Sequence, residues 1–93
     1  MIDDGETDWK CIVINVDDIL APRLNDIDDV EAELPGFVST LREWLRMYKT
    51  VDGKPQNEFG LDEKAVGREY TLKVIAETHE FWKRLTASGA KTV

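Results

Sequence analysis

An apolar segment near the N-terminus has the composition of a β-strand but no second segment to pair with. It runs from Trp9 to Val16, is rich in β-branched residues and is followed by Asp17 and Asp18, as is typical of a strand ended by a turn. Strand side chains alternate between two faces, and both faces here are largely apolar. A lone strand leaves half of its backbone groups unpaired. We therefore expect this strand to belong to a larger sheet or, as the alternative, to pair with another copy.

Helical patterns follow the strand. Residues 25–31 are acidic and suit a short capped turn of helix, because acids are favoured at a helix N-terminus. In the rest of the region 25–50, apolar residues recur at helical spacing from Phe37 to Tyr48. We expect this helix to begin with Pro35 at its first position and to end near Lys49.

A second long helix is predicted in the region 62–88, from about Arg68 to Ala87. Two amphipathic helices can pack as an antiparallel pair, whereas the strand has no partner within the chain. The expected fold class is α+β, with one barrel-type β-strand region and two long amphipathic helices in a single domain over residues 1–93.

Composition excludes several classes of protein. Nineteen acidic residues against twelve Lys and Arg give a net charge of -7, which disfavours nucleic-acid binding and polybasic membrane anchoring. The sequence has no apolar run of the roughly 18 residues that a membrane span requires, and no signal-peptide pattern at its start. A single Cys cannot form an internal disulfide framework. We therefore expect a cytoplasmic protein that binds neither nucleic acid nor membrane.

Three charged residues near the N-terminus could form a cation site. Asp8 and Lys10 share one strand face, and a turn through Gly5 could bring Asp3 beside Asp8. Carboxylates suit Mg²⁺, which is held by one or two of them together with water and substrate phosphate, and a nearby ammonium can bind phosphate oxygens. The alternative is that these acids keep a surface loop solvated, and the spacing alone favours this alternative.

A second candidate is the pair Tyr48–Lys49 at the end of the first long helix. Both residues have ordinary structural explanations. The ring of Tyr48 lies on the apolar stripe and suits a core position, and a lysine near a helix C-terminus is favoured by the helix dipole. The spacing alone favours these structural roles.

Taken in order, these segments resemble the C-terminal part of a soluble family I inorganic pyrophosphatase of the eukaryotic type. The resemblance runs from Met1 to about Leu85, and each fragment is weak by itself. Their order and spacing together make the match specific. The fragments are Met1–Lys10, Asn25–Val30, Leu34–Gly36, Trp44 with Tyr48–Lys49, Asp52–Pro55, and Glu77–Glu80 before Trp82–Lys83.

The resemblance implies a fold and an activity. The family folds as a small OB-like β-barrel flanked by helices, and it hydrolyses diphosphate to two phosphates with Mg²⁺. Residues 1–17 would then be a metal-binding loop and strand. The matching positions place Asp3 and Asp8 among the metal-binding aspartates. The substrate-binding positions for diphosphate and phosphate fall on Lys10, Tyr48 and Lys49.

One part of the family pattern is absent. The Asp-x-Asp-Pro-x-Asp stretch, which supplies further metal ligands and the base that activates water, does not occur in this sequence. The resemblance therefore assigns no catalytic residue to this chain and makes the missing N-terminal part of the same protein its partner. We expect the chain alone to be inactive, and a homo-oligomer is compatible with the sequence. The alternative is a non-catalytic acidic helical module that associates through its unpaired strand.

Overall fold

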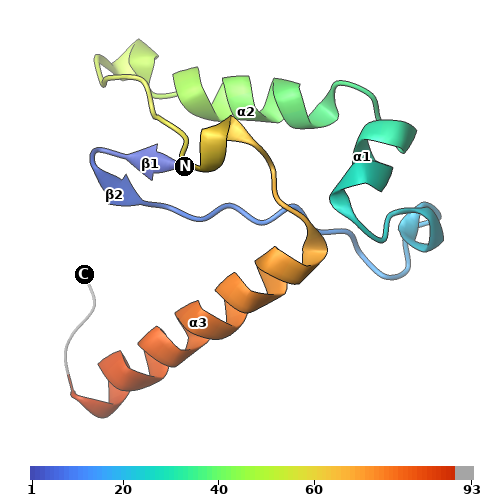
Figure 1. The fold of residues 1–93 in the computed structure, drawn as a ribbon. Helices are drawn as coiled ribbons and strands as arrows, with labels where there is room; N and C mark the ends of the chain where they lie inside the picture. Colours follow the sequence, from blue (N-terminus) through green and yellow to red (C-terminus); the bar gives the residue numbers. More distant parts are fainter. Residues whose placement is uncertain (90–93) are drawn as a thin grey trace.

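The computed structural model describes residues 1–89. A small β-hairpin lies below one helix, and a long helix extends away from both (Figure 1). In chain order the elements are β1 (Ile2–Asp3), β2 (Glu6–Thr7), the 3-10 turn η1 (Ala21–Arg23), α1 (Ile27–Glu33), α2 (Phe37–Met47), the 3-10 turn η2 (Thr50–Asp52), the turn η3 (Leu61–Glu63) and α3 (Arg68–Ala87). The α+β class is thus confirmed.

Local chemistry explains where α1 and α2 begin. Asp26 caps α1, and the Asp29 side chain accepts a hydrogen bond from the Asp26 backbone N–H at 3.1 Å, so the predicted short capped helix is confirmed. The predicted start of α2 at Pro35 is wrong. Gly36 precedes Phe37 with φ of 83°, a left-handed conformation that glycine adopts at no steric cost. This turn leaves Pro35 outside the helix.

The predicted strand Trp9–Val16 is not formed. The segment passes below α2 in Figure 1, and within residues 1–89 no backbone group of Trp9–Ile14 has a strand partner. A strand needs a neighbour to accept and donate its backbone hydrogen bonds, and the described residues supply none. The barrel-type strand region therefore stays a prediction about a larger assembly.

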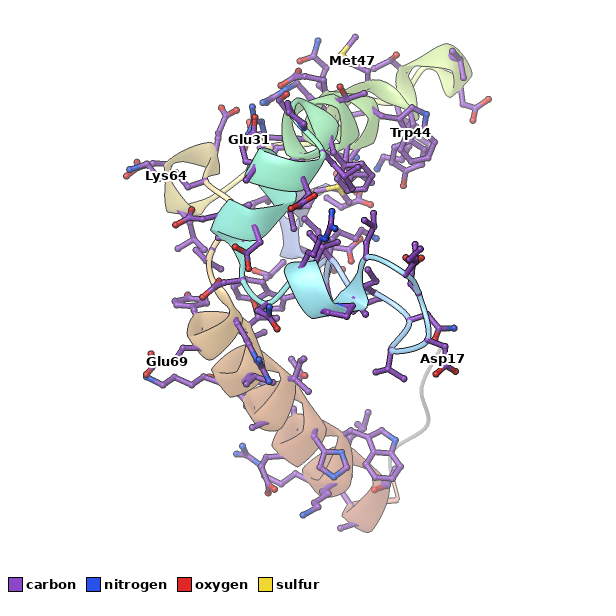
Figure 2. The ribbon with its side chains drawn as sticks, turned by 90° about the vertical axis from the view of Figure 1, so that its right-hand side faces the viewer. Asp17, Glu31, Trp44, Met47, Lys64 and Glu69 are labelled. Carbon is purple, nitrogen blue, oxygen red and sulfur yellow. The ribbon has the colours of Figure 1, made fainter. Side chains whose placement is uncertain are left out.

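The predicted second long helix agrees with α3, but α2 and α3 do not pack as an antiparallel pair. Instead α3 projects away from α1 and α2, as the side view shows (Figure 2). Its start is tied to α1 by one side chain: Asp26 Oδ1 accepts from the N–H of Ile27 at 2.7 Å and from that of Arg68 at 2.9 Å. One carboxylate therefore caps α1 and fixes the N-terminus of α3.

This shared cap gives a pH-dependent contact. Two backbone hydrogen bonds hold the pKa of Asp26 below its ordinary value of 3.8. The bond from the N–H of Arg68 has the larger effect, and the bond from the N–H of Ile27 has the smaller one. A carboxyl whose pKa is lowered on folding stabilises the fold above its unfolded pKa, and this stabilisation is lost as the pH falls through the folded pKa. We expect the Arg68 amide resonance, followed by NMR from pH 7 to about 2, to shift with a midpoint below 3.8.

Two variants check the assignment of that transition. Asp26→Asn is expected to abolish it, whereas Asp28→Asn, which alters an exposed acid in the same first turn, should leave it in place. A midpoint above the ordinary carboxyl value, or a transition that survives Asp26→Asn, would contradict the shared cap.

The chain buries little of its own apolar surface. Val30 is the only buried apolar side chain among the described residues, while large side chains such as Val13, Trp44 and Leu72 are exposed. The accessible surface is 7513 Å², against roughly 5,500 Å² for a compact monomer of this mass. The radius of gyration is 15.8 Å, against about 12 Å for a compact domain of this length. These helices and the extended segment therefore lack the cover that a complete core would give them.

Within residues 1–89, no helix has the length and apolar character needed to cross a membrane.

Candidate active site

The predicted carboxylates lie on a tight hairpin. Asp4 and Gly5 occupy its two central positions with φ of 51° and 79°, the positive values that a two-residue type I′ turn requires. Ile2 pairs with Thr7 and Asp3 with Glu6, and the N–H of Asp8 continues the ladder to the carbonyl of Met1 at 2.9 Å. Facing residues of a ladder share a face and faces alternate along a strand. The turn through Gly5 thus places Asp3 and Asp8 on one face.

The predicted tyrosine–lysine pair lies where α2 ends. Tyr48 follows the last residue of the helix, and its N–H donates to the carbonyl of Trp44 at 2.9 Å. The Tyr48 ring stacks on the Trp44 ring with centroids 4.9 Å apart. Trp44 is itself 61% exposed, so this aromatic pair lies at the surface rather than in a core. The surface position leaves the Tyr48 ring accessible.

Two ion pairs join four of the five predicted residues. The Lys49 ammonium pairs with the Asp3 carboxylate, 46 residues away in sequence, which brings the end of α2 to the hairpin. The Lys10 ammonium lies 3.3 Å from an Asp8 oxygen. Tyr48 adjoins Lys49, but within residues 1–89 no hydrogen bond links its hydroxyl to the other four. The structure thus assembles two Asp–Lys pairs with a tyrosine beside one of them.

Both pairs remain accessible to water. The Lys49 and Asp3 side chains are 22% and 28% exposed, and those of Lys10 and Asp8 are 44% and 39% exposed. The hydrogen bond to Asp3 raises the pKa of Lys49, although partial burial acts in the opposite direction. Lys49 therefore carries its positive charge throughout the physiological range. An anion approaching this surface meets an ammonium that is already charged and held in place.

The residues that hold the hairpin against α2 were not predicted from the sequence. The Asn57 side chain is the most buried of the described residues, at 2% exposed, and its amide donates to the carbonyl of Leu45 at 2.8 Å. The next residue, Glu58, exchanges two backbone hydrogen bonds with Ile2. Both lie between the two predicted helical regions, where no periodicity in the sequence distinguishes a buried asparagine from a solvated one.

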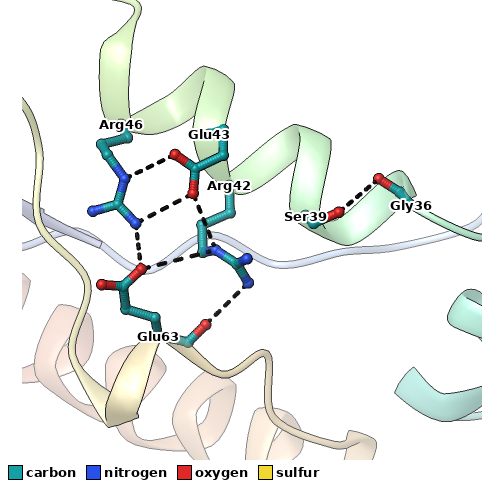
Figure 3. Close-up of polar contacts among 6 residues, drawn as sticks. All are labelled: Gly36, Ser39, Arg42, Glu43, Arg46 and Glu63. Atoms are coloured by element: carbon teal, nitrogen blue, oxygen red, sulfur yellow. Dashed lines mark hydrogen bonds and ion pairs between the residues drawn. The ribbon is translucent and has the colours of Figure 1, made fainter.

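A charged network braces the segment that follows. Arg42 and Arg46 project from α2 toward Glu63, and Glu43 bridges the two arginines (Figure 3). Glu63 belongs to η3, where three consecutive non-glycine residues have φ near 60°, a conformation that is costly for L-residues. The Arg46 guanidinium also lies 5.2 Å from the centroid of the Phe59 ring. The network offsets the strain of η3 by holding it to α2.

The side chains of Asp3 and Asp8 are chemically suited to bind a divalent cation. Two carboxylates on one hairpin face are the hard oxygen ligands that Mg²⁺ accepts beside water and phosphate. The described residues contain no group of three or more His, Cys, Asp or Glu side chains placed to hold a metal ion. Asp3 and Asp8 therefore fit as a partial ligand set, and a bound cation would replace Lys49 and Lys10 as their partners.

Comparison with known proteins decides the family. Residues 1–83 match the family model described as inorganic pyrophosphatase. The chain belongs to the inorganic pyrophosphatase family. The resemblance to the C-terminal part of such an enzyme is thus confirmed, and the alternative of a non-catalytic helical module is not favoured.

Individual inorganic pyrophosphatases resemble this chain in both sequence and fold. The chain is 54% identical over 90 residues to the inorganic pyrophosphatase of Eremothecium gossypii, covering 97% of this chain and 31% of that protein. It superposes on the inorganic pyrophosphatase structure from Schistosoma japonicum with a TM-score of 0.89 and 49% identity, covering 91% of this chain and 30% of the other. For the recombinant inorganic pyrophosphatase from T brucei brucei the TM-score is 0.91 at 38% identity, covering 95% and 26%. The pyrophosphatase-like chain therefore spans about 30% of the length of the relatives it matches.

Proposed function

We propose that this chain supplies part of the active site of a Mg²⁺-dependent diphosphatase, which hydrolyses diphosphate to two phosphates. The observation that carries the proposal is the ion pair between Asp3 and Lys49. It brings a hairpin carboxylate to the tyrosine–lysine pair at the end of α2, in a chain of the inorganic pyrophosphatase family. A truncated Trypanosoma cruzi vacuolar soluble pyrophosphatase that is similar to this chain was solved in complex with PPi, which supports diphosphate as the substrate.

The proposed roles follow from the chemistry of each group. Asp3 and Asp8 would hold Mg²⁺, which when bound polarises a phosphoryl group and lowers the pKa of water. Lys10 and Lys49, released from these carboxylates, would donate to the phosphate oxygens. The Tyr48 hydroxyl would add a neutral donor beside Lys49. Such donors stabilise the charge that develops on non-bridging oxygens during phosphoryl transfer.

The remainder of the proposal concerns what lies outside this chain. The segment Trp9–Val16 would join further strands of an OB-like barrel supplied by the N-terminal part of the same protein. Two observations support this: within residues 1–89 the backbone of Trp9–Ile14 has no strand partner, and apolar side chains of α2 and α3 are exposed. That part would also supply the carboxylate that activates water. We further propose a cytoplasmic location, although two relatives are named as chloroplastic.

A chimera tests the proposed function. The chain would replace the matching segment of the Eremothecium gossypii inorganic pyrophosphatase, to which it is 54% identical. We expect the chimera to release phosphate from diphosphate when Mg²⁺ is present and to stop when the metal is chelated. A chimera that folds, as judged by circular dichroism and a cooperative thermal transition, but releases no phosphate would refute the proposed function.

A further inference from the structure

Asn57 connects the two halves of the candidate site although it belongs to neither. Its side chain is 2% exposed, and a polar group so buried needs hydrogen-bond partners. The side-chain amide donates to the carbonyl of Leu45 at 2.8 Å, and the backbone N–H donates to the carbonyl of Arg46 at 3.0 Å. Carbonyls in the last turn of a helix lack partners within that helix. Asn57 therefore caps α2 directly before Tyr48 and Lys49.

The next residue holds the other half. The carbonyl of Glu58 accepts from the N–H of Ile2 at 2.6 Å, and the N–H of Glu58 donates to the carbonyl of Ile2 at 3.0 Å. Asp3 follows Ile2, and Lys49 lies two residues beyond the end of α2. One peptide bond, between Asn57 and Glu58, thus joins the cap on α2 to the bridge on β1. Through this connection the backbone that carries Asp3 is linked to the end of the helix that precedes Lys49.

We propose that Asn57 is a positioning residue for diphosphate hydrolysis. By capping α2 while Glu58 pairs with β1, it sets the spacing of Asp3 and Lys49, and so the spacing of the cation site and the phosphate donor. This inference rests on the proposed function above. The network of Arg42, Arg46 and Glu63 holds the following segment against the same helix, which restricts the freedom of Asn57 to move away. This role of Asn57 requires no contact with substrate or metal.

A matched pair of variants separates positioning from simple helix capping. Asn57→Ala removes the cap on Leu45, whereas Thr50→Val removes the hydroxyl that donates to the carbonyl of Met47 at 2.7 Å, in the same last turn of α2. Of the two, only Asn57 precedes a residue that shares backbone hydrogen bonds with the hairpin, whereas Thr50 follows Lys49, which meets the hairpin through its side chain alone. In the chimera we expect Asn57→Ala to raise the KM for magnesium diphosphate about 10-fold and to lower kcat as well, since small misplacements of reacting groups cost up to ~100-fold. Thr50→Val should lower thermal stability and leave KM unchanged.

A second readout does not depend on turnover. Exchange of the Ile2 amide, which donates to Glu58, should accelerate in Asn57→Ala and not in Thr50→Val. If Asn57→Ala prevents folding, Asn57→Leu is used instead, because it keeps a side chain branched at the same carbon, adds no charge and removes the donor to Leu45. An active chimera whose KM responds equally to Asn57 and Thr50 variants would overturn the role of Asn57 alone. A folded but inactive unsubstituted chimera would overturn the proposed function.

Discussion

Replacing Lys49 with methionine in the chimera is expected to lower kcat/KM for diphosphate by about 100- to 1,000-fold, the usual effect of removing one preorganised donor to a developing oxyanion. Methionine keeps an unbranched apolar stem of similar length, so the change removes the ammonium and little else. In the structure this ammonium pairs with Asp3 and is 22% exposed. It is therefore both held in position and accessible to an anion.

A structural effect of the same substitution should be small. Ion pairs that water reaches contribute little to stability, and the Asp3 side chain is 28% exposed and can be hydrated when its partner is lost. The thermal transition of Lys49→Met should therefore lie close to that of the unsubstituted chimera. A large loss of turnover without a comparable loss of stability is the expected signature of a substrate-binding lysine.

Two further variants control for charge. Lys54→Met removes the charge of an exposed lysine five residues along the chain and should leave kcat/KM within about twofold, since substitutions at such positions usually have small effects. Lys49→Arg keeps the charge but changes the donor geometry, so we expect it to recover only part of the activity. Equal losses in Lys49→Met and Lys54→Met would show that net charge matters and the position does not.

The helices were predictable because their signals are local. The spacing of apolar residues located α3 at Arg68–Ala87, and the acids around Asp26 located the start of α1. The start of α2 was misplaced because proline is common at a first helical position, while the left-handed turn at Gly36 depends on how two helices join. The packing of α1 against α2, which sets the geometry of this turn, cannot be read from composition.

The segment Trp9–Val16 shows that a composition typical of a strand does not by itself produce one. Its residues favour a pleated, buried surface, but a strand exists only when a neighbour pairs with it. The described part of this chain contains no such neighbour. The strand is therefore not formed within residues 1–89, and the expectation that the segment pairs with strands of a larger sheet stays a prediction.

The charged residues of the candidate site could be named from the sequence, whereas the residue that holds the hairpin against α2 could not. The Asp4–Gly5 pair indicates a tight turn, which places Asp3 and Asp8 on one hairpin face. Their lysine partners lie where the resemblance placed the substrate-binding groups, and their functional roles stay predictions. Asn57 could not be found, since its importance comes from burial between α2 and β1, and a single asparagine in an irregular stretch carries no local sign of it.

The 93-residue chain alone is expected to hydrolyse diphosphate no faster than the uncatalysed background. The described residues hold a partial cation site, with no cluster of three or more ligand side chains. The chain also spans only 31% of the Eremothecium gossypii relative. Positioned donors without a complete metal site and without a base to activate water lack the main sources of rate enhancement in phosphoryl transfer.

The most direct test of the central claim is phosphate release measured side by side for the purified 93-residue chain and for the chimera, at equal concentration and with saturating Mg²⁺. We expect steady turnover by the chimera, abolished by chelation of the metal, and a rate for the chain alone equal to that of buffer. Substantial Mg²⁺-dependent turnover by the purified chain alone would contradict the claim that it holds only part of a site.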